Sequence, residues 1–415
     1  MKLTVLAVSR EQDDCFYNGL SQSDIESIET FSGKAAAICY MKEPYFGSYV
    51  SNSEKAKVRF DRVIGTGHHS ISDHAFVSVL FEDIPKMTAM ILNSFGFYNT
   101  SEKSGRYTIM NSDKETMEKY AKNYALYNEW IEVFNKLIKE YDDTIEDKLR
   151  EKLALENARY MLSVFTPSTT MLYTTSIRMW SYIRQFCRDY ISAWNDGGAS
   201  LDLKRTKFND ELLKCIKDLY ESLTLANIYS EKIVDNKGRG CKFLARQTFY
   251  NIEDAEERYS DAYLIEYKSS FADLAQQQRH RTLDYFMCFD GSETMNFYVP
   301  KLLRGTDYER EWLCDLESIS DTFPIATLVK VIETGTISNF MLKCDERLCG
   351  RVQLETMDTI RTNLLKFERC WRKSPFMIDQ LKRHFRDGKV IMKCGNIQCK
   401  EPCHWGPIKA QEKLI

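Results

Sequence analysis

The segment Gly67–Tyr107 is the most distinctive part of the chain, and it opens with Gly67-His68-His69-Ser70-Ile71-Ser72-Asp73-His74. Three of the six histidines of the protein fall in this opening. The run Ala75–Phe81 is rich in β-branched and aromatic residues, which predicts a buried strand. Apolar residues then recur at helical spacing over Lys86–Leu92, which predicts a short helix. A polar loop is expected over Asn99–Tyr107.

This expected loop brings a carboxylate, two hydroxyl groups, a glycine and an arginine close together: Glu102, Ser101, Ser104, Gly105 and Arg106. A glycine-containing turn can direct backbone N–H groups at an anion, while an arginine closes over it with forked hydrogen bonds. A bound phosphate or carboxylate is one interpretation of the loop. A solvated turn is the other, and the residues of the loop do not separate the two.

Length and composition indicate a globular protein. A chain of 415 residues with 43% hydrophobic residues predicts roughly two to three domains with full cores. The formal net charge of -3 gives no overall field for nucleic acid or an anionic membrane, so any anion site must be local. No apolar run approaches the ~20 residues that span a bilayer. The 13 scattered cysteines and the early charged segment Ser9-Arg10-Glu11 predict a cytoplasmic protein with free thiols.

Helical periodicity organises the rest of the first half. A first strand, an acidic helix over Ser23–Thr30 and an apolar segment over Ala35–Tyr40 are expected before the histidine-rich segment. An aromatic stripe over Met117–Tyr141 predicts a long helix that packs in the core or against a subunit. Further helices are predicted over Ile145–Leu162, Thr174–Arg188 and Phe208–Leu223, with breaks at Asn195–Ser200 and Asp235–Gly240.

Beyond the second break, the order of the first half returns in degraded form. A strand over Ala262–Tyr267 precedes a helix over Ser270–Gln278, which ends in Arg279-His280-Arg281. A polar cluster, Arg347–Glu355, then precedes a helix to about Trp371. Arg279 lies 185 residues after Ser94, and Pro324 lies 161 residues after Ser163; the helical insert after Tyr107 accounts for the difference.

The C-terminal tail contains Cys394, Cys399, Cys403 and His404. Three thiolates and an imidazole could bind zinc, but adjacent Cys403 and His404 rarely ligate one ion and the spacing is not a pair of CxxC knuckles. Free thiols are therefore the default interpretation, and zinc remains the alternative.

The first half resembles the flavin-dependent thymidylate synthase family. The resemblance runs from Ala35–Tyr40 through Gly67–His74 and Glu102–Tyr107 to Ala158-Arg159. The signature of that family reads Arg-His-Arg, two variable residues, Ser, one variable residue, Asn-Glu, and then x-Ser-x-Arg-Tyr. The end of the signature is intact here, whereas Ser94-Phe95-Gly96 occupies its Arg-His-Arg positions.

The second half resembles the same family in a complementary way. It keeps Arg279-His280-Arg281, but Asp284–Met287 stands in place of Ser-x-Asn-Glu and Ser320 stands in place of Arg159. The resemblance therefore implies an α+β fold made of two tandem units, each a mainly antiparallel sheet with helices, which form a pseudo-dimer. The expected units are residues 1–198 with a helical insert at 108–157, a bridge at 199–240, a second unit at 241–372 and a tail at 373–415.

The resemblance also implies one composite site, since each half keeps the motif that the other has lost. The residues implied for dUMP are Gln276, Arg279, Glu102, Ser104, Gly105, Arg106, Arg159 and Arg347, of which Arg347, Arg279 and Ser104 are the implied catalytic residues. Those implied for FAD are His68, Ser70, Asp73, His280, Arg281 and Arg351. The mirror-image site should have lost both sets. Because members of the family are tetramers, a homodimer of this chain would complete a similar assembly.

The implied activity is C5 methylation of dUMP to dTMP, with methylenetetrahydrofolate as carbon donor and NADPH as electron source. Two alternatives remain open. Asp284 and the lost Ser and Asn-Glu positions suggest a related modification, such as hydroxymethylation of a pyrimidine nucleotide. A diverged duplicate could instead be an inactive nucleotide-binding scaffold.

Overall fold

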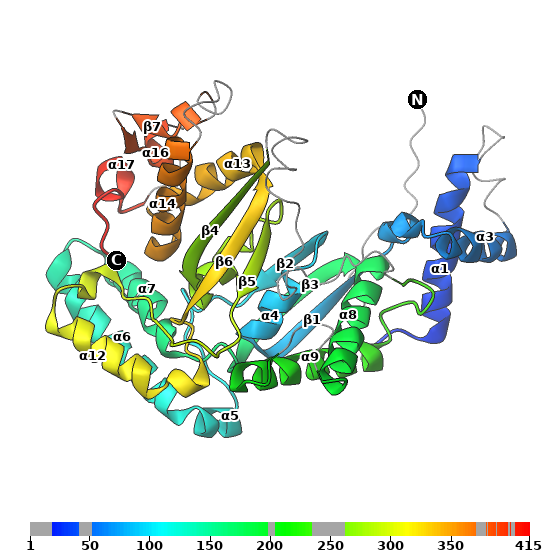
Figure 1. Cartoon of the computed structure of the whole chain (residues 1–415), viewed down its shortest axis with the longest axis horizontal. Coiled ribbons are helices and arrows are strands. Elements are labelled where there is room, and N and C mark those ends of the chain that lie inside the picture. The colour runs from blue at the N-terminus through cyan, green and yellow to red at the C-terminus, as the bar shows by residue number, and fades with distance from the viewer. Residues whose placement is uncertain are drawn as a thin grey trace.

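The computed structural model describes residues 19–40, 52–197, 204–234, 262–370, 379, 381–386, 388–396, 399 and 403–415. The fold is α+β, as the sequence predicts, with two three-stranded antiparallel sheets in the central part of the molecule and helices around them (Figure 1). The first strand expected before Ser23 and the break at Asp235–Gly240 lie outside the described residues.

The first half contains one sheet in the order β1-β3-β2. Its strands are β1 (Phe76–Pro85), β2 (Tyr98–Glu102) and β3 (Pro167–Ser176). Its helices are α1 (Gln22–Ala36), η1 (Ala37–Tyr40), α3 (Ser53–Gly65), η2 (His69–His74), α4 (Lys86–Leu92), α5 (Lys114–Lys119), α6 (Ala121–Tyr141), α7 (Asp147–Ala158), η3 (Arg159–Met161) and α8 (Ile177–Asn195). The helix α9 (Lys207–Ala226) follows as the predicted bridge.

Two expectations about this sheet are wrong. β1 is an edge strand rather than a buried one, and Phe76 and Leu80 on its outer face are 57% and 50% exposed. The helix expected to begin at Thr174 begins at Ile177, because the β-branched and aromatic run before it pairs as the central strand β3. The Ser176 side chain accepts a hydrogen bond from the Met179 amide and so caps α8 at this boundary. The loop expected from Asn99 is strand β2 up to Glu102.

The second half contains a sheet in the equivalent order, β4-β6-β5. Its strands are β4 (Ala262–Ser270), β5 (Asp284–Cys288) and β6 (Leu328–Thr336). Its helices are α11 (Phe271–Gln277), η5 (Lys301–Leu303), α12 (Asp307–Ser318), η6 (Ser320–Thr322), α13 (Ile337–Arg347) and α14 (Leu354–Cys370). The tail adds β7 (Phe385–Arg386), β8 (Lys389–Val390), α16 (Lys393–Asn396) and α17 (Gly406–Lys409).

The two sheets also share their register. Pro85 pairs with Pro167 in the first sheet, and Ser270 pairs with Leu328 in the second, at the separations that the matched positions require. A short helix joins the first two strands of each sheet, α4 in one and α11 in the other, and a longer helix follows the third strand. The two halves therefore have one arrangement of strands and helices.

The halves meet through reciprocal backbone hydrogen bonds. Val164 N donates to Phe323 O at 3.0 Å, and Ile325 N donates to Leu162 O at 2.8 Å, on either side of the bridge between Ser163 and Pro324. Because these residues are matched positions, each bond is the image of the other under exchange of the halves. Such self-complementary pairing is the mark of a two-fold contact.

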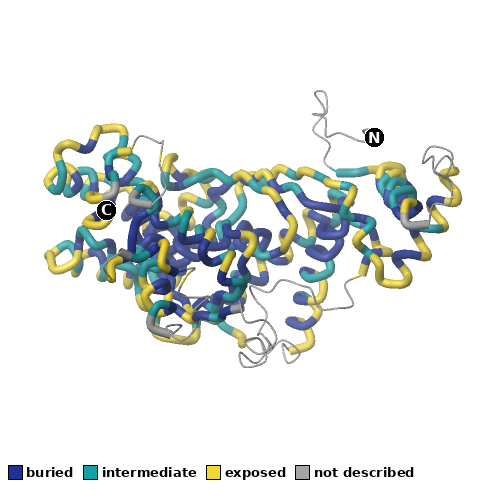
Figure 2. The backbone as a smooth tube through the Cα atoms, turned by 90° about the horizontal axis from the view of Figure 1, so that it is seen from above, coloured by how far each residue is buried: buried dark blue, intermediate teal, exposed yellow. Residues whose placement is uncertain are grey.

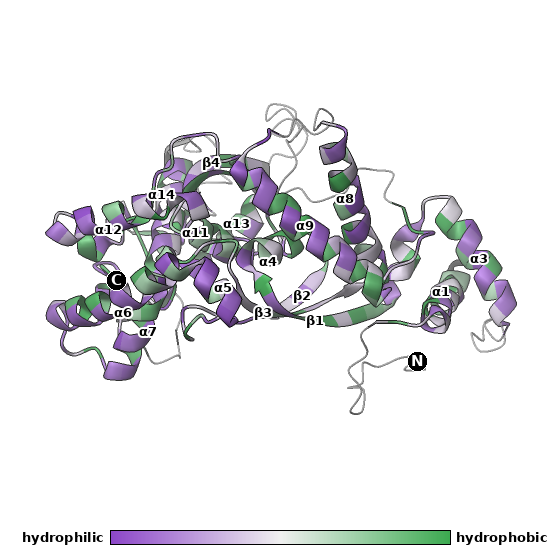
Figure 3. Cartoon of the chain, turned by 90° about the horizontal axis from the view of Figure 1, so that it is seen from below, coloured by the Kyte–Doolittle hydropathy of each residue, from purple (hydrophilic) through white to green (hydrophobic). Residues whose placement is uncertain are grey.

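Buried residues concentrate around the sheets, while the hairpin of α1 and α3 and the ends of the tail are more exposed (Figure 2). α9 alternates apolar and polar residues along its length (Figure 3) and buries Phe208, Leu212 and Ile216 against the core. In the helical insert, Trp130 and Phe134 of α6 pack on Trp312 of α12, with ring centroids 4.8 Å and 5.7 Å apart. The insert is thus anchored on the second half.

No helix within the described ranges is long and apolar enough to cross a membrane. The nine cysteines whose side chains the structure describes are all free thiols.

Candidate functional site

The arginine that follows α11 reaches the first sheet. Ser270 caps α11, and Arg279 leaves the turn at its other end. Arg279 Nη2 donates to Thr100 O of β2 at 3.0 Å, and its Nη1 lies 3.8 Å from Glu102 Oε2. Glu102 also accepts from Lys86 Nζ at 2.5 Å, and its side chain is only 7% exposed. The structure therefore brings the Arg279 motif of one half against the Glu102 motif of the other.

Arg281 contacts the same strand. Its guanidinium donates to Asn99 Oδ1 at 2.7 Å and to Tyr98 O, and lies over the Tyr98 ring at 5.5 Å. Between the two arginines, His280 is buried, and this burial, with Arg347 and Lys343 nearby, lowers the pKa of its imidazole to about 3. His280 is therefore neutral near pH 7.

Gln353 joins the two halves, although sequence reasoning gave it no role. Its carbonyl oxygen accepts from Arg159 Nη2 at 2.5 Å and from the Gln276 side chain, and its amide donates to the Tyr160 hydroxyl. Tyr160 in turn donates to Glu355 at 2.5 Å. Position within the polar cluster Arg347–Glu355 is the one signal that could have found this residue.

Two buried guanidinium groups in this region retain unused donors. The Nε atoms of Arg159 and Arg347 have no hydrogen-bond partner among the described residues. Burial lowers the pKa of both side chains, and for Arg347 the neighbouring Arg106 and Arg279 add to the effect. Buried cations without a matching acceptor are stabilised by an anion. The cluster can therefore hold an anionic ligand such as a phosphate or an anionic ring.

The Ser104–Arg106 turn lies beside this cluster. Ser104 Oγ accepts from the Arg106 amide at 3.3 Å, and a side chain at Gly105 would lie 3.2 Å from Met110 Cγ. Arg106 does not stand free over the turn: its Nε donates to Glu156 at 2.5 Å and its Nη2 donates to Arg351 O at 2.8 Å. The turn is thus anchored on both halves.

The remaining residues implied for the flavin lie on the first half. His68 and Ser70 are exposed. Asp73 is engaged by Arg178 at 2.5 Å and by Ser176 at 2.7 Å. Arg178 is therefore a buried packing residue, as expected, whereas His74 is exposed rather than a core histidine.

A row of side chains connects Asp73 with Arg281. Arg178, held by Asp73, lies 6.0 Å from the ring of Phe97, which is 77% exposed. The next residue is Tyr98, under Arg281. The residues implied for FAD on the two halves thus border one surface.

The mirror-image position carries none of these charges. Ser94 donates to Ile91 O at 2.5 Å, and Phe286 holds in β5 the register of Glu102 in β2, one residue earlier than the sequence match implies. Phe208 of α9 fills the space there, with its ring 4.9 Å from Phe289 and 5.2 Å from Phe323. The left-handed Gly291 lies against it, since a Cβ there would be 2.7 Å from Phe208 Cβ.

The tail cysteines form no recognisable metal centre. Among the described residues, no group of three His, Cys, Asp or Glu side chains is arranged to hold a metal ion. His404 is instead paired with Asp142 at 2.9 Å.

Comparison with known proteins locates the family within the first half. Residues 25–189 match the model of the thymidylate synthase complementing protein. A flavin-dependent thymidylate synthase from Pyrococcus abyssi is 26% identical over 134 residues, which are 31% of this chain and 53% of that protein. The chain thus spans about half the length of the curated relative it matches. Through residues 25–189, this chain belongs to the family of flavin-dependent thymidylate synthases.

Proposed function

We propose that this protein methylates dUMP at C5 to give dTMP, with methylenetetrahydrofolate as carbon donor and FAD and NADPH for the reduction. The observation that carries the proposal is the contact of Arg279 with Thr100 and Glu102. The part of the family signature that each half has lost is supplied at this contact by the other half. One complete composite site per chain follows.

The composite site in turn rests on a tandem pseudo-dimer. The equivalent strand orders, the shared register and the reciprocal bonds around Ser163 and Pro324 support two copies of one module related by a two-fold axis. At the mirror position the aromatic side chain of Phe208 occupies the space. A duplicated module that keeps one site and packs the other as core accounts for both observations.

In this site, Gln276, Arg279 and Arg347 would surround the pyrimidine, and Ser104, Gly105, Arg106 and Arg159 the sugar and phosphate. A nucleoside monophosphate carries about two negative charges, which forked guanidinium contacts and loop N–H groups hold well. The unused Nε donors of Arg159 and Arg347 fit this task. Arg279 and Arg347 would also stabilise the negative charge that develops on the pyrimidine carbonyls during attack at C5.

The residues present also fit a flavin. Exposed His68 and Ser70 and the apolar face of Phe97 lie on one side of the surface described above, and Arg281 lies on the other. The bound flavin would supply the hydride, while the protein orients the two ligands and sets the electrostatics. Asp73 would act through Arg178, which it holds beside Phe97.

The outer face of the first sheet supports a homodimer. Phe76, Leu80 and Leu172 lie exposed on this face, and Leu80 pairs directly with Leu172. The matching face of β4 instead carries the ion pair Glu266–Lys330. Because only the first sheet exposes large apolar side chains in this way, we propose that two chains pair through it.

The experiment compares two variants at matched positions of the two halves. We expect Arg279→Ala to abolish dUMP binding and Ser94→Ala to leave it unchanged, with Arg106→Ala behaving like Arg279→Ala. Binding is measured by calorimetry on the full chain, with melting temperatures as the folding control. Nucleotide binding that survives both arginine changes would contradict the composite site.

Product analysis then separates the activities. A flavin absorption spectrum in the purified protein argues against an inactive scaffold. Incubation with dUMP, methylenetetrahydrofolate and NADPH, followed by mass analysis of the nucleotide, distinguishes a methyl product from a hydroxymethyl product. Recovery of unmodified dUMP from flavin-loaded protein would overturn the proposed activity.

A further inference from the structure

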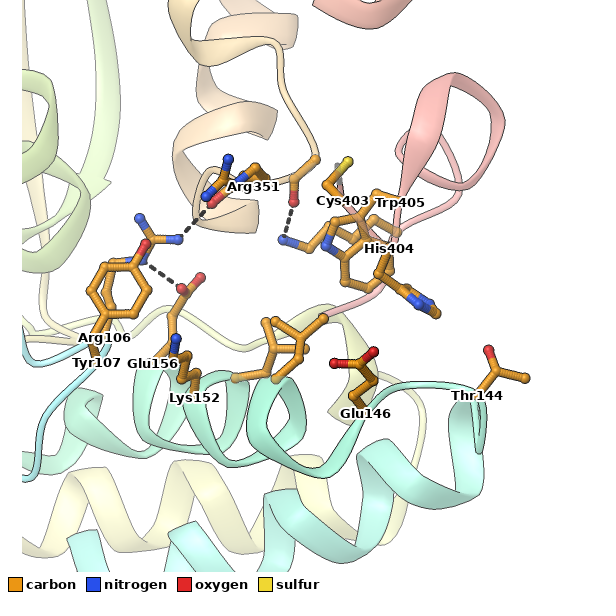
Figure 4. A pocket seen from close by; sticks show the side chains of 14 residues that line it. Arg106, Tyr107, Thr144, Glu146, Lys152, Glu156, Arg351, Cys403, His404 and Trp405 are labelled. Atoms are coloured by element: carbon orange, nitrogen blue, oxygen red, sulfur yellow. Dashed lines mark hydrogen bonds and ion pairs between the residues drawn. The ribbon is translucent and has the colours of Figure 1, made fainter. Parts of the chain in front are cut away.

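A cavity of about 560 Å³ lies beyond Arg106, between α7, the turn after α13 and the tail (Figure 4). Its volume is within the range of about 300–1,000 Å³ that is typical of ligand sites. Arg106 and Arg351 border one end of it, and Trp405 borders the other. Residues from both halves and from the tail thus enclose a space large enough for a ligand.

Cations dominate the described lining of this cavity. They come from four separate segments of the chain and converge on one space: Arg106, Lys152, Arg351 and Lys413. The carboxylates of the lining are Glu146, which is exposed, and Glu156, which Arg106 already neutralises at 2.5 Å. The lining therefore has an excess of positive charge.

Lys413 shows that this charge is costly to the free protein. The residue is only 2% exposed, and its ammonium donates to Gly350 O and Val352 O, both at 3.0 Å. Both of these acceptors are neutral, and burial lowers the pKa of Lys413 to about 8. An ammonium has three donors, so one remains for a ligand. An anion in the cavity would offset the cost of burying this charge.

The cavity also begins where the proposed nucleotide would end. Arg106, which the family resemblance places at the nucleotide phosphate, faces the cavity and holds the backbone of Arg351. We propose that the cavity is a polyphosphate site that takes the second and third phosphates of a pyrimidine nucleoside triphosphate. The nucleotide part of this inference rests on the proposed function, whereas the charge and enclosure of the cavity do not.

The test measures binding of dUMP, dUTP and inorganic tripolyphosphate to the full chain by calorimetry, without Mg²⁺ and at constant ionic strength. We expect dUTP to bind at least about 10-fold more tightly than dUMP, the effect of one added charge-assisted contact. Lys152→Ala should remove most of this difference and weaken tripolyphosphate binding by about 10-fold, but leave dUMP binding unchanged.

Lys148→Ala is the matched control, because Lys148 is an exposed lysine of the same helix that does not line the cavity. Equal affinities for dUMP and dUTP, or equal losses in the two lysine variants, would overturn the inference and leave the proposed function standing. Tripolyphosphate binding that depends on Lys152 in a protein that binds no pyrimidine nucleotide would support the polyphosphate site and overturn the proposed function.

Discussion

The replacement Gln353→Leu tests whether the two halves are held together through one buried side chain. Gln353 accepts from Arg159 and Gln276 and donates to Tyr160, so the change removes three hydrogen bonds. A bond to a charged group contributes about 1.5–3 kcal/mol and a neutral one about 1 kcal/mol. Since leucine regains some apolar burial, we expect the free energy of unfolding to fall by about 3 kcal/mol.

A double-mutant cycle makes this prediction specific. Arg159→Leu, Gln353→Leu and the double variant are unfolded in urea, with tryptophan fluorescence and circular dichroism followed together to verify a single transition. Because Arg159 and Gln353 share a bond at 2.5 Å between buried groups, we expect a coupling free energy of about 1.5–3 kcal/mol. The exposed Gln411→Leu serves as the control for the glutamine change.

The reasoning has a clear point of failure. If the two single changes add within about 0.5 kcal/mol, the bond between Arg159 and Gln353 does not couple the halves in solution. A transition that separates into two steps in the wild-type protein would likewise show that the halves unfold independently. Loss of dUMP affinity in Gln353→Leu without loss of stability would place Gln353 in ligand binding rather than in assembly.

Three further predictions concern buried groups. Lys343→Met should destabilise the protein by about 3–5 kcal/mol in urea unfolding, because it leaves Glu333, its fully buried partner at 2.7 Å, without a counter-charge; retention of full stability would refute this role. Burial and the neighbouring Asp273 raise the pKa of Glu355 to about 8, so its stabilising contribution is present below the ordinary carboxyl pKa and lost as pH rises toward 8; Glu355→Gln should flatten that loss, and an unchanged pH profile of stability would contradict it. Phe208→Ala should cost about 3–5 kcal/mol of stability by emptying the mirror position, without creating a second dUMP site; a stoichiometry of two nucleotides per chain would show otherwise.

Several elements could be predicted from the sequence because their signals lie within the segment itself. The helix α4 has the predicted bounds Lys86–Leu92, and α9 covers the predicted bridge. The serine caps of α8 and α11 lie next to the residues they bind, so cap and helix are read together. The internal repeat was also visible, since it depends only on the order of strands, helices and motifs.

Other features were decided by contacts between distant parts of the chain. β3 became a strand because β1 and β2 pair on either side of it, and β1 is exposed because nothing in the described chain covers its outer face. Composition cannot distinguish an edge strand from a buried one when both are apolar. The position of a strand in its sheet is a property of the assembled fold.

The candidate site shows the same division. The residue types of the anion cluster, such as Arg106, Arg279 and Arg347, were evident from the sequence, because arginines beside a glycine-containing turn suit phosphate recognition. Their partners were not: Glu156 on Arg106, Gln353 on Arg159 and Phe208 in the mirror position all approach from elsewhere in the chain. Hydrogen bonds and packing depend on distance in space, and only the folded chain brings these groups within a few ångströms of one another.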